Sequence, residues 1–188
     1  MRIIAGIARN LELNVPEGMG VRPTSGRGRK ALLDSLGDME EAAVLDLFSG
    51  SGAFGLECAS RGAGEVTLVE LSSAHIAVIR DNLKRVQRTG VETPVEIIQA
   101  DAMNPALYAR VPADLIFADP PYAESGQFFR KLTADPVFLE AFDGALLVWE
   151  IPDTPGARGD FINAPNFEEG SLRSLGGVWF FIGTVKKP

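Results

Sequence analysis

The chain has 188 residues, of which 46% are hydrophobic, enough for one full core and a single globular unit. No apolar stretch reaches the roughly 18 residues that cross a bilayer, and the first residues lack the apolar segment and cleavage site of a signal peptide, so we expect a cytoplasmic protein. The single cysteine, Cys58, excludes an internal disulfide and a cysteine-cluster metal site, and we expect it in the core.

The formal net charge of −7 is unevenly distributed along the chain. Residues 1–30 carry six positive and two negative charges, whereas residues 31–188 carry the other 12 positive and 23 negative charges. A basic segment on an acidic body can dock RNA, because phosphate contacts act over a Debye length of about 8–10 Å. The alternative is an ordinary solvated N-terminus.

The first predicted elements are short β-prone runs at 2–8 and 11–15, separated by Arg9 and Asn10, and this pattern favours a β-hairpin. A break rich in Pro and Gly follows at 16–20. Ser25 then fits the N-cap of a helix that ends near Leu36, before Gly37.

From residue 43 onward, apolar runs alternate with helix-like segments. The runs lie at 43–47, 65–69, 95–98, 114–118 and 145–149, and the helical segments lie near 54–61, 72–88 and 124–141. Nearly continuous apolar strands between helices indicate a parallel sheet covered on both faces, which is a doubly wound α/β domain.

The end of the chain departs from this rhythm. Residues 171–175 and 178–184 resemble two strands joined by Gly176 and Gly177, with no helix between them. An antiparallel hairpin on an otherwise parallel sheet, seven strands in all, fits a Rossmann-like methyltransferase fold better than a dehydrogenase fold. The proline-containing stretch 152–166 is expected to be a long surface loop.

A glycine-rich turn follows the first strand of the α/β region. The sequence D-L-F-S-G-S-G-A-F-G at 46–55 places Gly50, Gly52 and Gly55 in a G-x-G-x-x-G pattern, which lets backbone approach a ligand at a helix N-terminus. The pattern alone does not separate NAD, FAD and S-adenosylmethionine. Asp46 helps to separate them, because a carboxylate there would repel a pyrophosphate and attract a sulfonium or an amino group.

Two further acids follow strand ends. Glu70 closes the run at 65–69, where its carboxylate can accept both hydroxyls of a ribose. Asp101, with Ala102, follows the run at 95–98, where it could meet the edge of an adenine; a simple helix N-cap is the alternative for Asp101.

The most informative motif is Asp119-Pro120-Pro121-Tyr122, directly after the apolar run 114–118. The carboxylate of Asp119 and a proline-fixed backbone carbonyl can accept the two N–H groups of a planar amine, while the ring of Tyr122 offers a stacking surface. Together with the glycine turn, this motif predicts an enzyme that moves a group from a nucleoside-containing cofactor onto an exocyclic nitrogen. The alternative is that the motif only ends a strand.

These motifs, in this order, resemble the RsmD-like 16S rRNA guanine-N2 methyltransferases. The resemblance spans nearly the whole chain and includes the opening R-I-I-A-G, the segment Arg22-Pro23-Thr24, the glycine turn with 60–63, Glu70, Asp101-Ala102 and Asp119-Pro120-Pro121-Tyr122. It implies a small N-terminal β-hairpin extension with the R-P-T segment over 1–24 and a methyltransferase domain over 25–188. It also implies a monomer that acts on 16S rRNA or on a small-subunit assembly particle.

The resemblance assigns roles residue by residue. S-adenosylmethionine would be held by Asp46, Ser49, Gly50, Gly52, Glu70, Asp101 and Ala102. The target guanine would be received by Asp119, Pro120 and Tyr122, without a metal. The RNA would be bound by Arg2, Arg9, Arg22, Thr24, Arg27 and Arg29.

The chain departs from the family pattern after the R-P-T segment. The family usually continues with an acid, Arg, an aliphatic residue, Arg and Glu, whereas this chain has S-G-R-G-R-K at 25–30. Arg27 and Arg29 keep their places, but Gly28 replaces the aliphatic residue and Lys30 replaces the Glu. The basic run usual near position 10 is reduced to Arg9. These changes bear on RNA docking.

Other residues are expected to have structural or surface roles outside the predicted site. His75 lies far in sequence from the motifs, and we expect it on the surface or in helix packing. A basic stripe on the helix at 72–88 is expected to be a solvated face, with RNA contact as the alternative; it comprises Arg80, Lys84, Arg85 and Arg88. Trp149 is expected near the pocket or in the core, and Glu150 is left outside the catalytic set.

Two rival functions are also compatible with the sequence. An adenine-N6 DNA methyltransferase would use the same D-P-P-Y chemistry, although 188 residues leave little room for the target-recognition domain that it needs. A noncatalytic RNA-binding or assembly module could keep the fold and the cofactor. Transfer to a protein glutamine is disfavoured, because those enzymes carry Asn at the position of Asp119.

Overall fold

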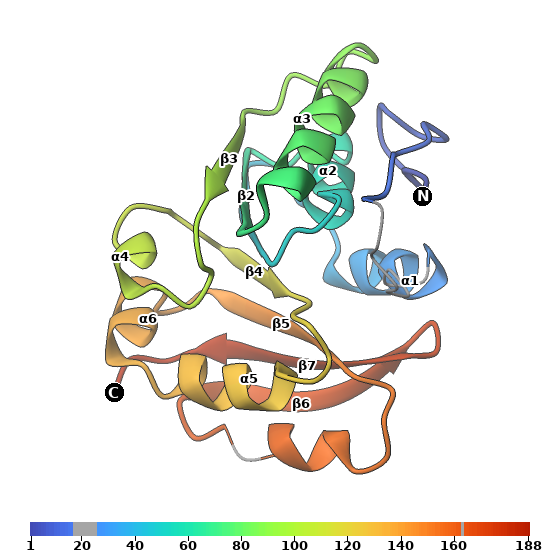
Figure 1. The fold of residues 1–188 in the computed structure, drawn as a ribbon. Coiled ribbons are helices and arrows are strands. Elements are labelled where there is room, and N and C mark those ends of the chain that lie inside the picture. The colour runs from blue at the N-terminus through green and yellow to red at the C-terminus, as the bar shows by residue number, and fades with distance from the viewer. Residues whose placement is uncertain (17–25, 163) are drawn as a thin grey trace.

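The computed structural model describes residues 1–16, 26–162 and 164–188. One sheet of seven strands organises the fold (Figure 1). Its strands are β1 Ala43–Leu47, β2 Glu65–Glu70, β3 Val95–Gln99, β4 Leu115–Ala118, β5 Leu146–Ile151, β6 Phe167–Leu175 and β7 Val178–Val185. The helices are α1 Gly26–Leu36, α2 Ala53–Ser60, α3 Ser73–Gln87, α4 Pro105–Tyr108, α5 Ser125–Thr133, α6 Pro136–Ala141 and the 3-10 helix η1 Ala157–Phe161.

The strand order is β3-β2-β1-β4-β5-β7-β6, with β1 to β5 parallel and with β7 antiparallel to both β5 and β6. The fold prediction is therefore confirmed: an α/β, mostly parallel seven-stranded sheet with a C-terminal antiparallel hairpin. The order reverses at β1 and β4, so the crevice of a doubly wound fold is expected at their carboxyl ends.

Two apolar clusters cover the two faces of the sheet, as alternation along buried strands requires. On one face, Val44 and Phe117 pack with residues of α1, α2 and α3. On the other face, Leu45 and Leu47 pack with residues of α4, α5, α6 and η1. Cys58 belongs to the first cluster and is fully buried, as expected, and burial raises the pKa of its thiol.

Two predicted segments differ in detail from the structure. The helix expected over 124–141 is two helices, because Asp135 caps the Val137 amide at 2.8 Å and Pro136 starts a new helix. The stretch 152–166, expected to be a loop, contains η1, whose Phe161 packs against Phe129 of α5 with ring centroids 4.7 Å apart. Gly37, with a φ of 81°, ends α1 as expected.

The N-terminal segment, residues 1–16, contains a β-bridge between Arg2 and Glu12 in place of two regular strands. The pairing is antiparallel, and the Ile3 amide donates to the Leu11 carbonyl at 2.9 Å. The segment lies beside α2 and α3 (Figure 1), and Ile3 and Leu13 belong to the first apolar cluster. The proposed division of the chain after residue 24 stays a prediction.

A buried carboxylate attaches this segment to α2. Glu57 has no exposed surface, and its two oxygens accept hydrogen bonds from the amides of Ile4 and Ala5 at 2.7 and 2.9 Å. Arg61 donates to the same carboxylate at 3.1 Å, and the Arg29 guanidinium lies 3.9 Å from it. A charge this deep in the protein is tolerated because cations and amides surround it.

The substitution Glu57→Ala should lower the free energy of unfolding by about 3–5 kcal/mol, because it leaves Arg29 buried without its counter-charge and two amides without an acceptor. Urea unfolding measures the loss. The matched control is Glu65→Ala at an exposed position of β2, which should change stability by less than about 0.5 kcal/mol. Equal effects of the two substitutions would contradict the role of Glu57.

Candidate active site

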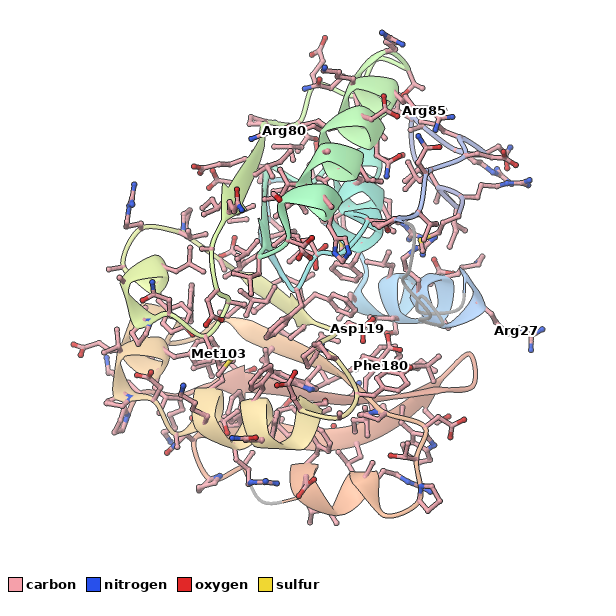
Figure 2. All side chains as sticks on the ribbon, in the orientation of Figure 1. Arg27, Arg80, Arg85, Met103, Asp119 and Phe180 are labelled. Atoms are coloured by element: carbon pink, nitrogen blue, oxygen red, sulfur yellow. The ribbon has the colours of Figure 1, made fainter. Side chains whose placement is uncertain are left out.

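The register of the central strands brings the sequence motifs to one edge of the sheet. Leu47 at the end of β1 pairs with Val69 of β2 on one side and with Ala118 of β4 on the other. The glycine turn, Glu70 and Asp119 follow these three positions directly. Asp119 lies at the end of β4, on the side of the sheet that faces α1 (Figure 2).

The glycine turn has a conformation that requires glycine at defined positions. Gly50 and Gly52 have φ values of 55° and 75°, in the left-handed region. At Gly55 the reason is packing, because a Cβ there would lie 2.3 Å from a methyl group of Leu68. Ser49 steadies the turn: its amide donates to the Val69 carbonyl at 2.9 Å, and its hydroxyl is hydrogen-bonded inside the turn.

Glu70 holds the turn with both carboxylate oxygens. Oε2 accepts from the Gly50 amide and Oε1 from the Ser72 amide, each at 2.8 Å. The side chain is 11% exposed, and a carboxylate has about four acceptor positions, so further donors can be accommodated. Contact with ribose hydroxyls stays a prediction that this geometry permits.

Asp46 lies beneath the turn. It is buried, and its Oδ2 accepts from the Gly55 amide at 3.1 Å. Burial raises the pKa of Asp46 to about 7; the hydrogen bond from Gly55 opposes this shift and the charge of Glu70 adds to it. The carboxylate therefore supports the first turn of α2, and its expected contact with a ligand stays a prediction.

Asp101 and Ala102 lie in the turn after β3. Asp101 is exposed, and its Oδ1 accepts from the Met103 amide at 2.9 Å. The simple helix-cap alternative for Asp101 is wrong, because Asn104 is the N-cap of α4. Ala102 is buried, and its carbonyl accepts from the Tyr108 hydroxyl at 2.9 Å. The exposed carboxylate of Asp101 is compatible with the predicted adenine contact.

The Asp119 segment combines fixed and exposed groups. Asp119 is half-buried, Pro120 is buried, and Tyr122 is 39% exposed. Because Ala118 of β4 pairs with Trp149 of β5, Asp119 follows β4 beside the buried Glu150. Trp149 is a core residue whose Nε1 donates to the Ser125 hydroxyl at 2.9 Å.

The predicted RNA-binding residues are accessible to solvent, outside the described residues or, for Arg29, buried. Arg2, Arg9 and Arg27 are accessible to solvent, although Arg2 lies 3.6 Å from Glu12, and Arg27 points away from Asp119 (Figure 2). Arg22 and Thr24 lie outside the described residues. Contact of the accessible arginines with RNA stays a prediction.

Arg29 requires a correction. Its side chain is only 2% exposed, and it donates to the Arg2 carbonyl at 2.6 Å and faces Glu57. Burial lowers the pKa of Arg29, and Glu57 opposes this shift. The assignment of Arg29 to RNA is wrong because the guanidinium is used to join α1 to the N-terminal segment.

His75 lies on α3 with a side chain that is 26% exposed, and its Nδ1 is 3.4 Å from Oε1 of Glu70. It is therefore near the motifs in space, although it is far from most of them in sequence. No pattern in the sequence identified Asn82 either, which is fully buried and donates from Nδ2 to the carbonyls of Ser51 and Asn14 at 3.0 Å. A single buried Asn on an amphipathic helix carries no distinctive sequence signal.

The basic stripe of α3 is divided between two directions. Arg80 and Arg85 leave the helix on different sides (Figure 2), and Arg85 donates to the Asn14 side chain at 3.2 Å. Among the described residues, no group of three or more His, Cys, Asp or Glu side chains could hold a metal ion. No helix within the described ranges is long and apolar enough to span a bilayer.

The fold and this edge define the class of protein. A doubly wound sheet with this strand order and a C-terminal antiparallel hairpin is a Rossmann-like methyltransferase fold. The left-handed glycines, the partly exposed Glu70 and the exposed Asp101 fit a nucleoside-containing ligand along the ends of β1, β2 and β3.

Comparisons with known proteins agree with this class. Residues 1–153 match the model of the family described as conserved hypothetical protein 95. The chain belongs to this family, that of the RsmD-like proteins.

Two curated proteins are similar to this chain in sequence. The Escherichia coli K12 protein named ribosomal RNA small subunit methyltransferase D is 35% identical over 123 residues, 65% of this chain and 60% of that protein. The match thus spans less than two thirds of that relative's length. The Bacillus subtilis protein named "Putative rRNA methyltransferase YlbH" is 31% identical over 83% of this chain and 88% of that protein.

Solved structures resemble nearly the whole chain. A hypothetical protein of Thermus thermophilus has 31% identity and a TM-score of 0.74, covering 98% of this chain and 99% of its own. An Escherichia coli structure has 26% identity and a TM-score of 0.71, covering 100% of this chain and 99% of its own.

The pKa of Asp46 predicts a pH dependence of stability. Since the folded-state pKa of about 7 exceeds the ordinary value of 3.8, the folded protein binds more protons than the unfolded chain between these pH values. This contribution to stability is present below about pH 4 and should be lost as the pH rises to about 7. Asp46→Asn keeps an acceptor for Gly55, so urea unfolding should show a flatter pH profile. An unchanged profile would contradict the assignment.

Proposed function

We propose that this protein transfers a methyl group from S-adenosylmethionine to the exocyclic N2 of a guanine in 16S rRNA. The observation that carries the proposal is the pairing of β1 with β4, in which Leu47 opposes Ala118. Because of this pairing, the glycine turn and the Asp119 segment begin at neighbouring strand ends, where a cofactor and a base can meet. The names of the two curated relatives support rRNA as the substrate.

The cofactor would be held by groups from three strand ends. Backbone of Ser49, Gly50 and Gly52 would line it, Glu70 would accept its ribose hydroxyls, and Asp101 with Ala102 would meet its adenine. When bound, it supplies an electrophilic methyl group beside a positive charge. A cationic ligand would favour the ionised form of the buried Asp46, whose carboxylate would then add a negative potential beneath the turn.

Asp119, Pro120 and Tyr122 would prepare the guanine. The N2 lone pair is delocalised into the ring, which makes the amine a weak nucleophile. Asp119 and the Pro120 carbonyl would accept its two N–H groups, raising the electron density on N2 and fixing its direction. Asp119 need not be a strong base, because the N–H proton becomes acidic only as the new N–C bond forms.

The base must leave its stack in the RNA before it can react, and this costs a few kcal/mol. Tyr122 is exposed enough to repay part of that cost by stacking. Arg2, Arg9 and Arg27 would bind phosphates, and Arg22 and Thr24 would also take part in binding the RNA. The enzyme would act as a cytoplasmic monomer on free rRNA or on an assembling small subunit.

The substrate can be tested directly. Small subunits that lack the modification would be incubated with the protein and tritiated S-adenosylmethionine, and the labelled nucleosides would be separated. Label in N2-methylguanosine supports the proposal. Label in adenosine would indicate adenine-N6 chemistry, and absence of label would indicate a noncatalytic RNA-binding module; either result would overturn it.

Asp119→Ala should abolish measurable methyl transfer, because N2 loses one of its two acceptors, while the cofactor dissociation constant changes by less than about threefold. Single-turnover assays and calorimetry measure the two quantities. A variant with near wild-type transfer would remove Asp119 from the mechanism.

Tyr122→Ala should reduce kcat/KM for RNA by roughly 5- to 150-fold, the equivalent of a stacking contribution of ~1–3 kcal/mol. Tyr122→Phe is the matched control, since it keeps the ring and should retain most of the activity. Equal losses in the two variants would point to the hydroxyl and against stacking.

A further inference from the structure

The backbone of Phe48 is unusual for a large side chain. Its φ of 60° lies in the left-handed region, which is costly for a residue with a bulky Cβ substituent. Alternation along β1 would place Phe48 on the face of Val44 and Asp46. Its ring packs instead with the opposite cluster, on the same face as Leu47. The left-handed conformation thus accompanies a ring turned toward α5.

The Phe48 ring contacts two aromatic residues on that face. It stacks on Phe128 of α5, with centroids 5.8 Å apart and planes within 7° of parallel. Its centroid lies 6.3 Å from that of Trp149 in an edge-on arrangement. Trp149 in turn donates to the buried hydroxyl of Ser125, the first residue of α5. The ring therefore meets α5 directly and through Trp149.

The first turn of α5 follows the Asp119–Tyr122 segment closely in the chain. Only Ala123 and Glu124 separate Tyr122 from α5. The Glu124 amide donates to the Pro121 carbonyl at 3.0 Å, and the Phe128 amide donates to the Glu124 carbonyl at 2.9 Å. A shift of α5 would be transmitted to Asp119 and Tyr122 through these bonds.

We infer that Phe48 is a positioning residue: its strained backbone and its stack on Phe128 set the spacing between the glycine turn and the Asp119–Tyr122 segment. The inference rests on the proposed function, because that spacing matters only if the turn holds the methyl donor and the segment holds its acceptor. Phe48 acts through α5, with no contact to reacting atoms required. Angstrom-scale errors in such spacing reduce turnover strongly.

The test uses Phe48→Leu, Phe128→Leu and the double variant, assayed below their melting temperatures. Each single substitution should lower kcat about 10- to 100-fold with less than about threefold change in the cofactor dissociation constant. The double variant should be no slower than the slower single variant, because both substitutions break one coupling. Phe48→Tyr keeps the ring and should retain a kcat close to that of the wild type. Additive losses, or a loss confined to cofactor affinity, would overturn the inference.

A second readout does not depend on methyl transfer. In the absence of substrate, Phe48→Leu should raise hydrogen exchange at the amides of residues 128–133, which donate within α5, by about fivefold or more. The matched control is Phe54→Leu, which breaks a different aromatic stack, with Phe117 at 3.8 Å on the other face, and should leave exchange in α5 unchanged. If the wild type methylates no RNA, the proposed function is wrong. If hydrogen exchange in α5 is unchanged in Phe48→Leu, only the inference about Phe48 is wrong.

Discussion

The structure depends on the burial of one carboxylate, that of Glu57. Removing a carboxylate and a guanidinium from water costs several kcal/mol for each ion, so the pair with Arg29 is tolerated only because Ile4, Ala5 and Arg61 supply further donors. These donors come from the N-terminal segment and from the end of α2, and Arg29 comes from α1. The charge therefore joins three parts of the chain that share little other secondary structure, and it does so on the helix that begins at the glycine turn.

The glycine turn is in turn fixed by side chains from three elements. Asp46 from β1 and Glu70 from β2 each accept an amide of the turn, and Asn82 from α3 binds the carbonyl of Ser51. Asn82 also holds Asn14, so the N-terminal segment and the turn share one buried amide. Groups held this way before a ligand arrives need little rearrangement on binding. The N-terminal segment, which was expected to extend the domain and to bind RNA through Arg2 and Arg9, thus also supports the predicted cofactor edge.

The fold and the main motifs could be predicted from the sequence because they rest on local signals. The apolar runs predicted every parallel strand. Asp135-Pro136 is a helix-start signal that marks the break between α5 and α6, although a single helix was expected there. Arg29 could not be placed, because its partner Glu57 lies on another helix and a basic segment looks solvated in isolation. The position of His75 beside Glu70 and the conformation of Phe48 were not predicted, because their neighbours come from other elements and no sequence pattern specifies a left-handed phenylalanine.

The two departures from the family pattern in α1 lie in different surroundings, and Gly28 faces the C-terminal hairpin. Gly176 at its tip has a φ of 59°, and a Cβ there would lie 2.5 Å from the Arg27 carbonyl oxygen and 2.9 Å from the Gly28 Cα. The hairpin thus lies against the backbone of α1 at the buried Gly28. Lys30 lies on the exposed side and pairs with Asp34 one turn later. Arg29 points between them toward Glu57, so α1 can change at its neighbouring positions and remain attached to the N-terminal segment.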